Sequence, residues 1–396
     1  MSVPTNAGTG FTRRIDPIEW WFLGFPRRVS AALNLCVEGA GHIDPAELRR
    51  AVAIASRACP GARLVRRGRT WVDSGVTPAV TVAPGVPAEA PELRTPLPGR
   101  AGRTCEVVLF PGPQPTVVFR AGHAVMDARG LLWWARDVFR VLRGEEPVGA
   151  TSAATFEDLD DPLHRKAGES ESESGSESGS GVPALLGVPP GADLRRQLWR
   201  RRTIEGTVPA LEARLAAALV ELSGHAVAPV GFVVDVRPGH PGIRSTGNLS
   251  LAVSLDLRAG DAWPDVDRQL AAALADRTCR VDAPGAEVLK APLPLLRHIV
   301  RRVDRGARRD DRHSLLAEVY HLGPVRPGWF HTDDFTAAAG YALCPMEPGA
   351  ALSVVATEGD GRTDLTLSWW DGPGMAERAD ALLDRLGAAL VPQETG

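Results

Sequence analysis

A polar stretch at residues 168–181, which contains only Ser, Glu and Gly, is the feature that most constrains how this chain can fold. Because the stretch has no apolar side chain, burial cannot repay the entropy lost on ordering it, so we expect a linker or loop there. It separates two parts of comparable size in a chain of 396 residues, which is longer than one ordinary core requires. We therefore expect an N-terminal lobe over 1–165, a flexible linker over 166–190 and a C-terminal lobe over 191–396.

The composition excludes several function classes. Hydrophobic residues make up 44% of the chain, which is enough for two buried cores. A net charge of −3 argues against a nucleic-acid or anionic-membrane partner, because both need a clustered basic excess. The 5 cysteines are widely spaced and form no Cys-x-x-Cys pair, so neither a metal site nor a disulfide framework is predicted. No apolar run could span a membrane or act as a secretory signal, so we expect a cytoplasmic protein.

Periodicity predicts mixed α/β structure in both lobes. Helices are expected from Pro45 to about residue 59 and over 129–142, 209–222, 264–277, 286–303 and 374–390. Strands are expected over 32–38, 62–66, 70–73, 105–110, 116–119, 230–236, 249–257, 352–356 and 365–369. Asp44 and Glu47 have the spacing of a capping box at the start of the first helix. Since strands and helices do not alternate strictly, a mixed sheet in each lobe is expected rather than a doubly wound parallel one.

His123 and Asp127 lie four residues apart, between a predicted strand and a predicted helix. A histidine at the exit of a buried strand is held by the sheet and can point into a cleft. Its imidazole titrates near neutral pH, so it can accept a proton from an amine or a hydroxyl. Asp127 would either orient the ring or anchor the loop to an arginine. By itself, the spacing favours a histidine that only turns a loop. No Gly-x-Ser-x-Gly, His-Glu-x-x-His or P-loop sequence occurs, which disfavours serine hydrolases, zincins and P-loop NTPases.

Residues 116–132 resemble the HHxxxDG region of the condensation-domain superfamily, which includes nonribosomal-peptide condensation domains and CoA-dependent acyltransferases. Other segments resemble the family in the same order: the strand and helix around Asp44, the apolar strand 231–238 with the following Gly247-Asn248, and the stretch 319–324. The resemblance therefore covers nearly the whole chain. It implies two chloramphenicol-acetyltransferase-like lobes in a V, with a tunnel between them in which donor and acceptor meet.

The resemblance also assigns roles to individual residues. The catalytic histidine of the family, the second of its pair, falls on His123. Its aspartate falls on Asp127, where the usual role is an ion pair with an arginine of the C-terminal lobe, and Arg237 is the residue that matches this arginine. Such a buried pair would fix the shape of the histidine loop. No metal site is implied.

Two positions depart from the family pattern. Gly122 stands where the first histidine is expected, and Ala128 stands where a glycine usually follows the aspartate. The first histidine is generally structural, so its loss need not abolish activity, whereas Ala128 matters if that position needs a positive φ. Gly122, Asn248 and His321 are candidates for lining the tunnel, although an Asn beside a glycine is also an ordinary turn.

We expect a free-standing enzyme that transfers an acyl group from a thioester to a small amine or hydroxyl acceptor in natural-product biosynthesis, with His123 as general base. The expected donor is a phosphopantetheine-bearing carrier protein in trans, because no GGxS-type attachment sequence occurs. CoA as the acyl carrier is one alternative. A degenerate module that only recruits a carrier protein, suggested by Gly122 and Ala128, is another. Since the two lobes already form a pseudo-dimer, a monomer is expected.

Overall fold

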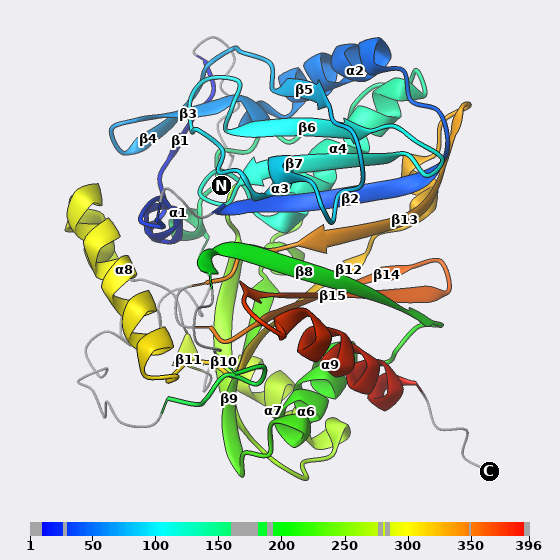
Figure 1. Ribbon diagram of the computed structural model, residues 1–396. Helices are drawn as coiled ribbons and strands as arrows, with labels where there is room; N and C mark the ends of the chain where they lie inside the picture. Colours follow the sequence, from blue (N-terminus) through cyan, green and yellow to red (C-terminus); the bar gives the residue numbers. More distant parts are fainter. Residues whose placement is uncertain are drawn as a thin grey trace.

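The computed structural model describes residues 10–26, 30–159, 181–187, 193–275, 280–281, 286–347 and 350–391. They form two lobes, drawn one above the other in Figure 1, each with a mixed sheet and helices packed on it. The predicted fold class, two mixed α/β lobes, is thus confirmed. The predicted linker falls outside the described residues except for 181–187, where Val182 forms an isolated bridge with His313.

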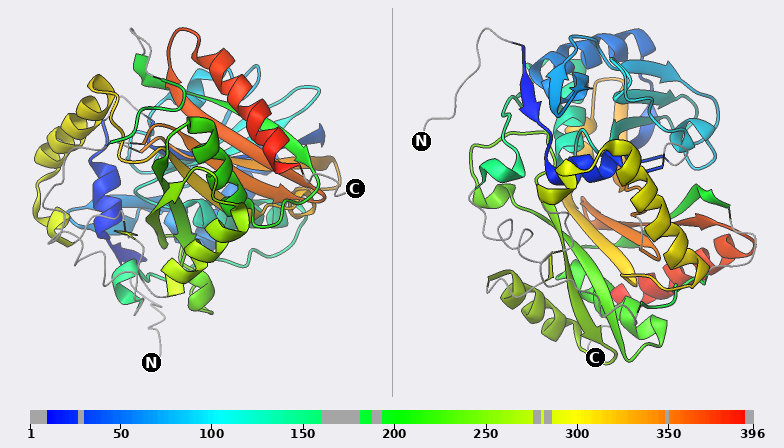
Figure 2. Two further views of the ribbon diagram at one scale, coloured as in Figure 1. Left: turned by 90° about the horizontal axis from the view of Figure 1, so that it is seen from below. Right: turned by 90° about the vertical axis from the view of Figure 1, so that its left-hand side faces the viewer.

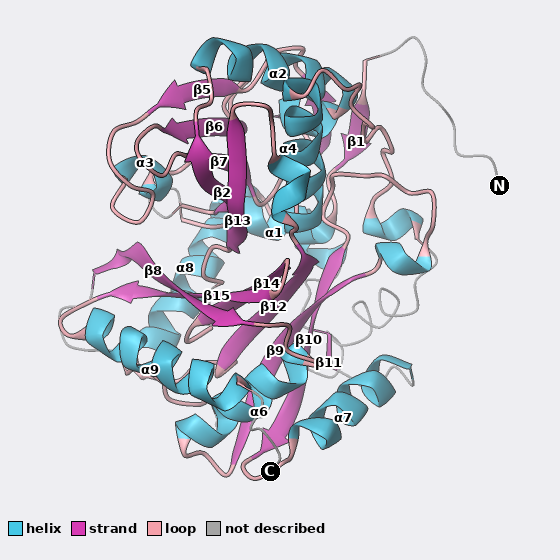
Figure 3. Ribbon diagram, turned by 90° about the vertical axis from the view of Figure 1, so that its right-hand side faces the viewer, coloured by secondary structure: helices cyan, strands magenta, loops and turns pink. Residues whose placement is uncertain are grey.

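The upper lobe is built on a five-stranded sheet in the order β13-β2-β7-β6-β5. Its strands are β2 (Ala32–Gly41), β5 (Ala79–Val82), β6 (Cys105–Phe110), β7 (Thr116–Gly122) and β13 (Phe335–Leu343). Neighbouring strands run antiparallel except for β5 and β6. The helices α2 (Pro45–Ala58) and α4 (Ala128–Leu142) cover one face of this sheet (Figure 3).

The two faces of this sheet carry different side chains. Along β2, Leu33 and Leu35 belong to the core beneath the helices, whereas Cys36 belongs to a smaller cluster on the opposite face. This alternation follows from the two-residue period of a strand. On that opposite face Arg120 of β7 forms a buried ion pair with Glu106, and it also donates to the carbonyl of Thr95 at 2.8 Å. It thereby holds the short helix α3 (Pro91–Arg94) against the sheet.

The lower lobe has a seven-stranded sheet in the order β11-β10-β9-β12-β14-β15-β8. Its strands are β8 (Asp193–Glu205), β9 (Val227–Asp235), β10 (Ser250–Arg258), β11 (Arg280–Val281), β12 (Ala317–Pro324), β14 (Ser353–Gly359) and β15 (Arg362–Asp371). The helices α6 (Leu211–Ser223), α7 (Trp263–Ala275) and α9 (Met375–Leu390) lie together on one side of it (Figure 3).

A third, small sheet, in the order β1-β4-β3, contains the first strand of the chain. It consists of β1 (Thr12–Arg14), β3 (Leu64–Arg67) and β4 (Thr70–Asp73), and α1 (Pro17–Leu23) follows β1 directly. The helix α8 (Leu293–Arg309) packs beside α1, as the right-hand view of Figure 2 shows. Short 3-10 turns complete the described elements: η1 (Pro60–Arg63), η2 (Phe156–Asp158), η3 (Arg237–Gly239), η4 (Ala286–Lys290) and η5 (Pro327–Phe330).

The C-terminal half of the chain contributes one strand to the upper lobe. The strand β13 comes from the C-terminal half of the sequence, yet it pairs with β2 from Phe335 opposite Gly41 to Leu343 opposite Asn34, with one register shift between Ala337 and Ala339. Phe330 and Phe335 are buried in the upper core and pack against Phe139 of α4. The upper lobe is therefore completed by residues that lie far along the chain.

Most predicted elements occur within a few residues of their predicted bounds. The helix predicted over 286–303 is different, because it divides into η4 and α8 at Pro292, which cannot donate a backbone hydrogen bond. The strand predicted over 62–66 begins only at Leu64, after the turn η1. The capping box predicted at Asp44 is half formed: Asp44 accepts from the N–H of Ala46 at 2.9 Å, but Glu47 faces Arg50 instead. The elements β1, α1, β5, α3, β8, β11, β12 and β13 were not predicted.

Four cysteines, Cys36, Cys59, Cys105 and Cys344, are buried as free thiols, and Cys279 lies outside the described residues. Burial raises the pKa of Cys36 and of Cys105 to about 12, so these thiols act as small core residues. Over the described ranges, no group of three His, Cys, Asp or Glu side chains has metal-binding geometry. None of the helices in those ranges is both long enough and apolar enough to cross a membrane.

Candidate active site

The loop 123–127 joins β7 to α4 at the seam between the lobes. The N–H of Gly122 donates to the carbonyl of Thr104 at 2.9 Å, and that of His123 donates to the carbonyl of Ala31, also at 2.9 Å. The chain then turns, with the N–H of Val125 donating to the carbonyl of Gly122 at 2.8 Å. Asp127 caps α4 by accepting from the N–H of Gly130 at 2.8 Å. The histidine is thus held between a strand end and a helix start.

Asp127 and Arg237 form a buried ion pair across the two lobes. Nη1 of Arg237 lies 2.9 Å from Oδ2 of Asp127, and Nη2 lies 3.1 Å from Oδ1, so the pair is bidentate. The carboxylate also accepts from the N–H of Leu249 at 3.0 Å. Nη1 of Arg237 contacts Asp235 at 2.8 Å, and Nη2 donates to the carbonyl of Gly247 at 2.7 Å. Burial alone would lower the pKa of Arg237, but the charges of Asp127 and Asp235 outweigh it and raise the pKa above its ordinary value.

Two carbonyls of the loop are held by side chains from elsewhere. Nδ2 of Asn248 donates to the carbonyl of His123 at 2.8 Å, and Nη2 of Arg13 donates to the carbonyl of Val125 at 2.9 Å. Both side chains also contact Glu19 of α1, which is fully buried. Arg13 forms an ion pair with Glu19, and Asn248 donates to it at 3.4 Å. A single buried carboxylate therefore connects both supports of the loop.

The imidazole of His123 is stacked on Phe22 of α1. The two ring centres are 3.8 Å apart and the ring planes differ by 17°. Nδ1 of His123 is buried and makes no hydrogen bond to the described residues. Burial lowers the pKa of His123 to about 4, and its own carbonyl and the charge of Asp127 offset this only in part. The ring is consequently neutral near pH 7, which is the form that accepts a proton.

The two departures from the family pattern cost little in this fold. Ala128 is the first residue of α4, and the described non-glycine residues with positive φ are Ala210 and Asp311, so Ala128 needs no left-handed backbone. A Cβ at Gly122 would meet the carbonyl oxygen of Thr104 at 3.5 Å and Cγ2 of Val125 at 4.0 Å, which are ordinary contacts. The concern that Ala128 would strain the turn is therefore removed.

The structure brings most of the predicted residues together, but not His321. His123, Asp127, Arg237, Gly122 and Asn248 all lie in or against the loop, as the contacts above show. The exception, His321 on β12, lies between two carboxylates: its Nε2 is 3.5 Å from Glu358 and its Nδ1 is 3.9 Å from Glu212. Burial lowers the pKa of His321, but these two carboxylates outweigh it and the net shift is upward. Its role in lining a tunnel stays a prediction.

Sequence reasoning missed Arg13, Glu19 and Phe22. A signal was present, because Asp16-Pro17-Ile18-Glu19 has the same capping-box spacing as Asp44-Pro45-Ala46-Glu47. At this second site the box does form, with Asp16 accepting from the N–H of Ile18 and Glu19 accepting from the N–H of Asp16. The segment Trp20-Trp21-Phe22 follows this cap directly, and the ring of Phe22 covers the histidine.

Of two cavities in the described part of the chain, neither is lined by His123. One lies between α6 and α7, where Arg214, Glu221 and Trp263 contribute to its walls. The other lies between the two lobes, and its lining includes Ser30 and Ala32, which flank the residue that accepts the hydrogen bond from His123. The second cavity therefore begins beside the backbone of the histidine loop.

The sheets, the lobe crossover and the seam loop together define the fold of the condensation-domain superfamily, and the chain has this fold. The resemblance noted in the sequence is confirmed at this level. No protein-family profile and no curated protein matches the sequence itself. Solved structures provide the match.

The cyclization-docking bidomain of the EpoB nonribosomal peptide synthetase from Sorangium cellulosum is one such structure. It is 14% identical, with a TM-score of 0.65 over 99% of this chain and 88% of that one. The first condensation domain of the calcium-dependent antibiotic synthetase, solved with a substrate analogue, is 17% identical, with a TM-score of 0.61 over 97% and 96%. The epimerization domain from the third module of a tyrocidine synthetase is 14% identical, with a TM-score of 0.59 over 98% of both chains. At these identities the similarity establishes the fold.

Proposed function

We propose that this chain is a condensation-type acyltransferase, which moves an acyl group from a carrier-protein thioester to an amine or hydroxyl acceptor. The observation that carries this proposal is the neutral imidazole of His123, held at the lobe seam with its backbone fixed at both the N–H and the carbonyl. The fold supports it, since condensation and starter condensation domains are among the similar structures.

In the proposed reaction, His123 accepts a proton from the acceptor's amine or hydroxyl. The acceptor's lone pair attacks the thioester carbonyl carbon, and a tetrahedral intermediate forms. The C–S bond then breaks, and the leaving thiolate takes the proton back from His123. General-base assistance of this kind contributes about 10²–10⁴ in rate, and binding both substrates in one orientation contributes the rest. Asp127 and Arg237 keep the loop in shape and do not touch the reacting atoms.

The helix α8 supports a carrier protein as the partner. Leu295, Ile299 and Val303 are 51%, 41% and 48% exposed, and their spacing places them in one stripe along the helix. The exposed residues Arg301 and Arg305 lie beside this stripe. The start of α8 packs against the end of α1, where a Cβ at Gly24 would lie 2.8 Å from Leu296, and α1 carries the Phe22 ring that stacks on His123. We place the docking of a carrier protein here, since an apolar stripe with a basic edge is complementary to an acidic partner that carries a phosphate.

Single-turnover transfer from an acyl-loaded carrier protein tests the proposed function. We expect His123→Ala to lower the rate about 10²–10⁴-fold, while His42→Ala, at an exposed histidine, leaves it unchanged. An unchanged rate in His123→Ala would refute the base role. Running the same assay with acyl-CoA distinguishes a CoA donor from a carrier donor.

A second candidate function, carrier binding without catalysis, is favoured by one observation. Phe22 covers a face of the imidazole, and the Nδ1 of His123 is buried without a hydrogen bond to the described residues. This function predicts carrier binding that is equal in the wild type and in His123→Ala, with no turnover in either. In both cases Arg301→Glu with Arg305→Glu should weaken carrier binding, and Arg49→Glu on the distant helix α2 should not.

A further inference from the structure

The lower sheet forks between two of its central strands. The strands β9 and β12 pair only as far as Val319 opposite Phe232, although β9 continues to Asp235 and β12 continues to Pro324. Beyond the last pair, the backbone groups on the two facing edges need partners from outside this ladder. A side chain that contacts both strand ends would therefore set how far apart they lie.

A β-bulge on β12 lies within this fork. The register between β12 and β14 shifts between His321 and Gly323, so Leu322 has no partner residue on β14. Gly323 has a φ of +73°, which is the left-handed conformation of the glycine in one common type of bulge. Bulges of this kind redirect the groups beside them and are frequent next to active sites.

Arg129 of α4 bridges the two sides of the fork. Its Nη2 donates to the carbonyl of Leu322 at 2.8 Å, and its Nε lies 3.4 Å from Oδ2 of Asp235. One guanidinium from the upper lobe thus contacts the ends of both lower strands. The planar guanidinium has donors in a fixed fork and suits two acceptors at once, whereas the ammonium of a lysine is a single point charge.

The charges at this seam are arranged reciprocally. The upper lobe contributes Asp127 and Arg129, two residues apart, and the lower lobe contributes Asp235 and Arg237, also two residues apart. Asp235 lies 2.8 Å from Nη1 of Arg237 and also faces Arg129. Arg237 in turn pairs with Asp127. The four charges alternate in sign, so the segment that follows His123 is tied to the lower lobe at two positions.

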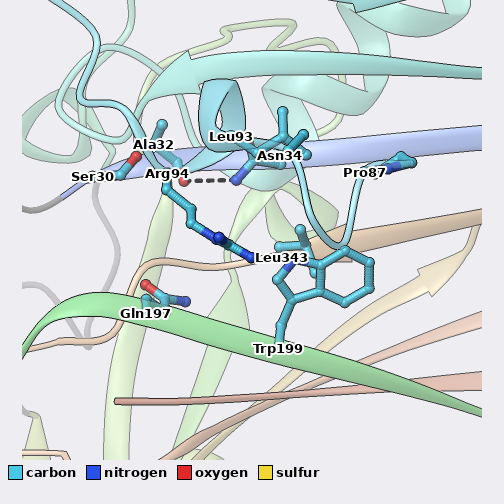
Figure 4. A pocket seen from close by; sticks show the side chains of 10 residues that line it. Ser30, Ala32, Asn34, Pro87, Leu93, Arg94, Gln197, Trp199 and Leu343 are labelled. Atoms are coloured by element: carbon cyan, nitrogen blue, oxygen red, sulfur yellow. Dashed lines mark hydrogen bonds between the residues drawn. The ribbon is translucent and has the colours of Figure 1, made fainter. Parts of the chain in front are cut away.

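The lobes are also joined at β8, without Arg129. Figure 4 shows Trp199 pointing from β8 toward the upper lobe. Its ring centre is 5.8 Å from that of Tyr341 on β13, and Arg201 of β8 forms an ion pair with Glu38 of β2. Loss of Arg129 would therefore loosen the fork and leave the lobes connected.

We infer that Arg129 is a positioning residue for His123. It holds the ends of β9 and β12 at a fixed distance from the loop 123–127, and it thereby fixes how the two lobes face one another around the imidazole. It acts through the carbonyl of Leu322 and the carboxylate of Asp235, not on the reacting atoms. Its effect on turnover rests on the proposed function, whereas its effect on the fork does not.

Steady-state acyl transfer measures the positioning role. A displacement of about 1 Å can lower a rate about 10²-fold, so we expect Arg129→Gln to lower kcat by about this factor and to leave KM for the acyl-loaded carrier protein unchanged. Arg129→Lys should recover part of the loss, because its ammonium can reach one of the two acceptors. The matched control is Arg143→Gln. Arg143, at the other end of α4, also donates to two backbone carbonyls, those of Trp329 and His331, each at 3.0 Å, and its loss should leave kcat unchanged.

Hydrogen–deuterium exchange supplies a readout that needs no turnover. We expect the amides of 231–237 and 319–324 to exchange faster in Arg129→Gln than in the wild type. The amides of 197–205 should exchange as before, because β8 keeps its own contacts with the upper lobe. None of these three segments should change in Arg143→Gln.

Three results would overturn the inference: an unchanged kcat in Arg129→Gln, an equal loss of kcat in Arg143→Gln, or unchanged exchange at the fork. A merely structural role would lower stability in both variants without this difference in kcat. If the wild type itself transfers no acyl group, the proposed function fails. The exchange at the fork then still decides whether Arg129 holds the two strands.

Discussion

At the scale of single residues, the site depends on one imidazole that stays neutral and one ion pair that is closed to water. Both conditions arise from burial. In His123, burial disfavours the charged imidazolium and lowers the pKa. In Asp127 and Arg237, the ion pair offsets the free-energy cost of burying two charges. Gly122 and Ala128, which looked like defects in the sequence, fit the backbone without strain. The sequence therefore predicted which residues to examine, but it could not give the protonation state of His123.

We expect His123 to titrate near pH 4, well below the ordinary value of 6.5. The unfolded chain binds this proton near pH 6.5 and the folded chain does not, so the stability contributed here falls as pH drops from 6.5 to 4. NMR titration with labelled histidine measures the pKa directly, and Phe22→Ala should raise it by exposing the ring. A wild-type value of 6 or above would contradict the assigned burial.

We expect Arg237→Ala to lower the free energy of unfolding by about 3–5 kcal/mol, because it leaves the Asp127 carboxylate buried without its counter-charge. The cost should be smaller in an Asp127→Asn background, where that charge is absent. Denaturant unfolding of the two single variants and the double variant measures the coupling. Strictly additive effects would mean that the ion pair does not stabilise the fold.

At the scale of elements, α1 acts as a support for the loop 123–127. The helix contributes Phe22 to one face of the imidazole, and its Glu19 holds Arg13 and Asn248, which in turn hold the loop carbonyls. The capping-box spacing at Asp16 is a local signal for the start of α1 that sequence reasoning missed, and it does not show what the buried carboxylate of Glu19 contacts. Those partners come from positions 13, 71 and 248, which only the folded chain brings together.

We expect Glu19→Gln to destabilise the protein by about 3–5 kcal/mol, because Arg13 loses its buried partner. The same change at Glu47, whose contact with Arg50 is exposed, should cost less than 1 kcal/mol. Hydrogen exchange should become faster in the loop 123–127, and the pKa of His123 should move toward 6.5 as Phe22 loosens. A purely structural role would destabilise the fold and leave that pKa unchanged in the folded protein.

At the scale of the whole molecule, the upper lobe is not formed by one continuous stretch of the sequence. The polar stretch predicts a division of the chain, yet β13 returns to the upper sheet and brings Phe330 and Phe335 into its core. Hydrophobic patterning within a segment predicts which face of a strand is buried. It does not predict which of two sheets the strand joins.

We expect a fragment of residues 1–165 to remain unfolded by itself, because the edge of β2 and the core around Phe139 would lack β13. Co-expression with residues 191–396 should restore a folded complex. Circular dichroism and NMR dispersion of the separate and combined fragments measure this. A well-dispersed spectrum from the fragment of residues 1–165 alone would show that the upper lobe folds without β13, which contradicts this prediction.

The sequence alone determined the local structure, that is, where most helices and strands form, because periodicity, capping and turn chemistry act over a few residues. The roles expected of His123, Asp127 and Arg237 came instead from the resemblance to the condensation-domain superfamily. Tertiary structure alone decided the rest, namely the stacking of Phe22 on His123, the support by Glu19, the crossing of β13 and the cavity between the lobes. Each of these joins residues that are distant in the chain, and their contact energies exist only after both lobes have packed.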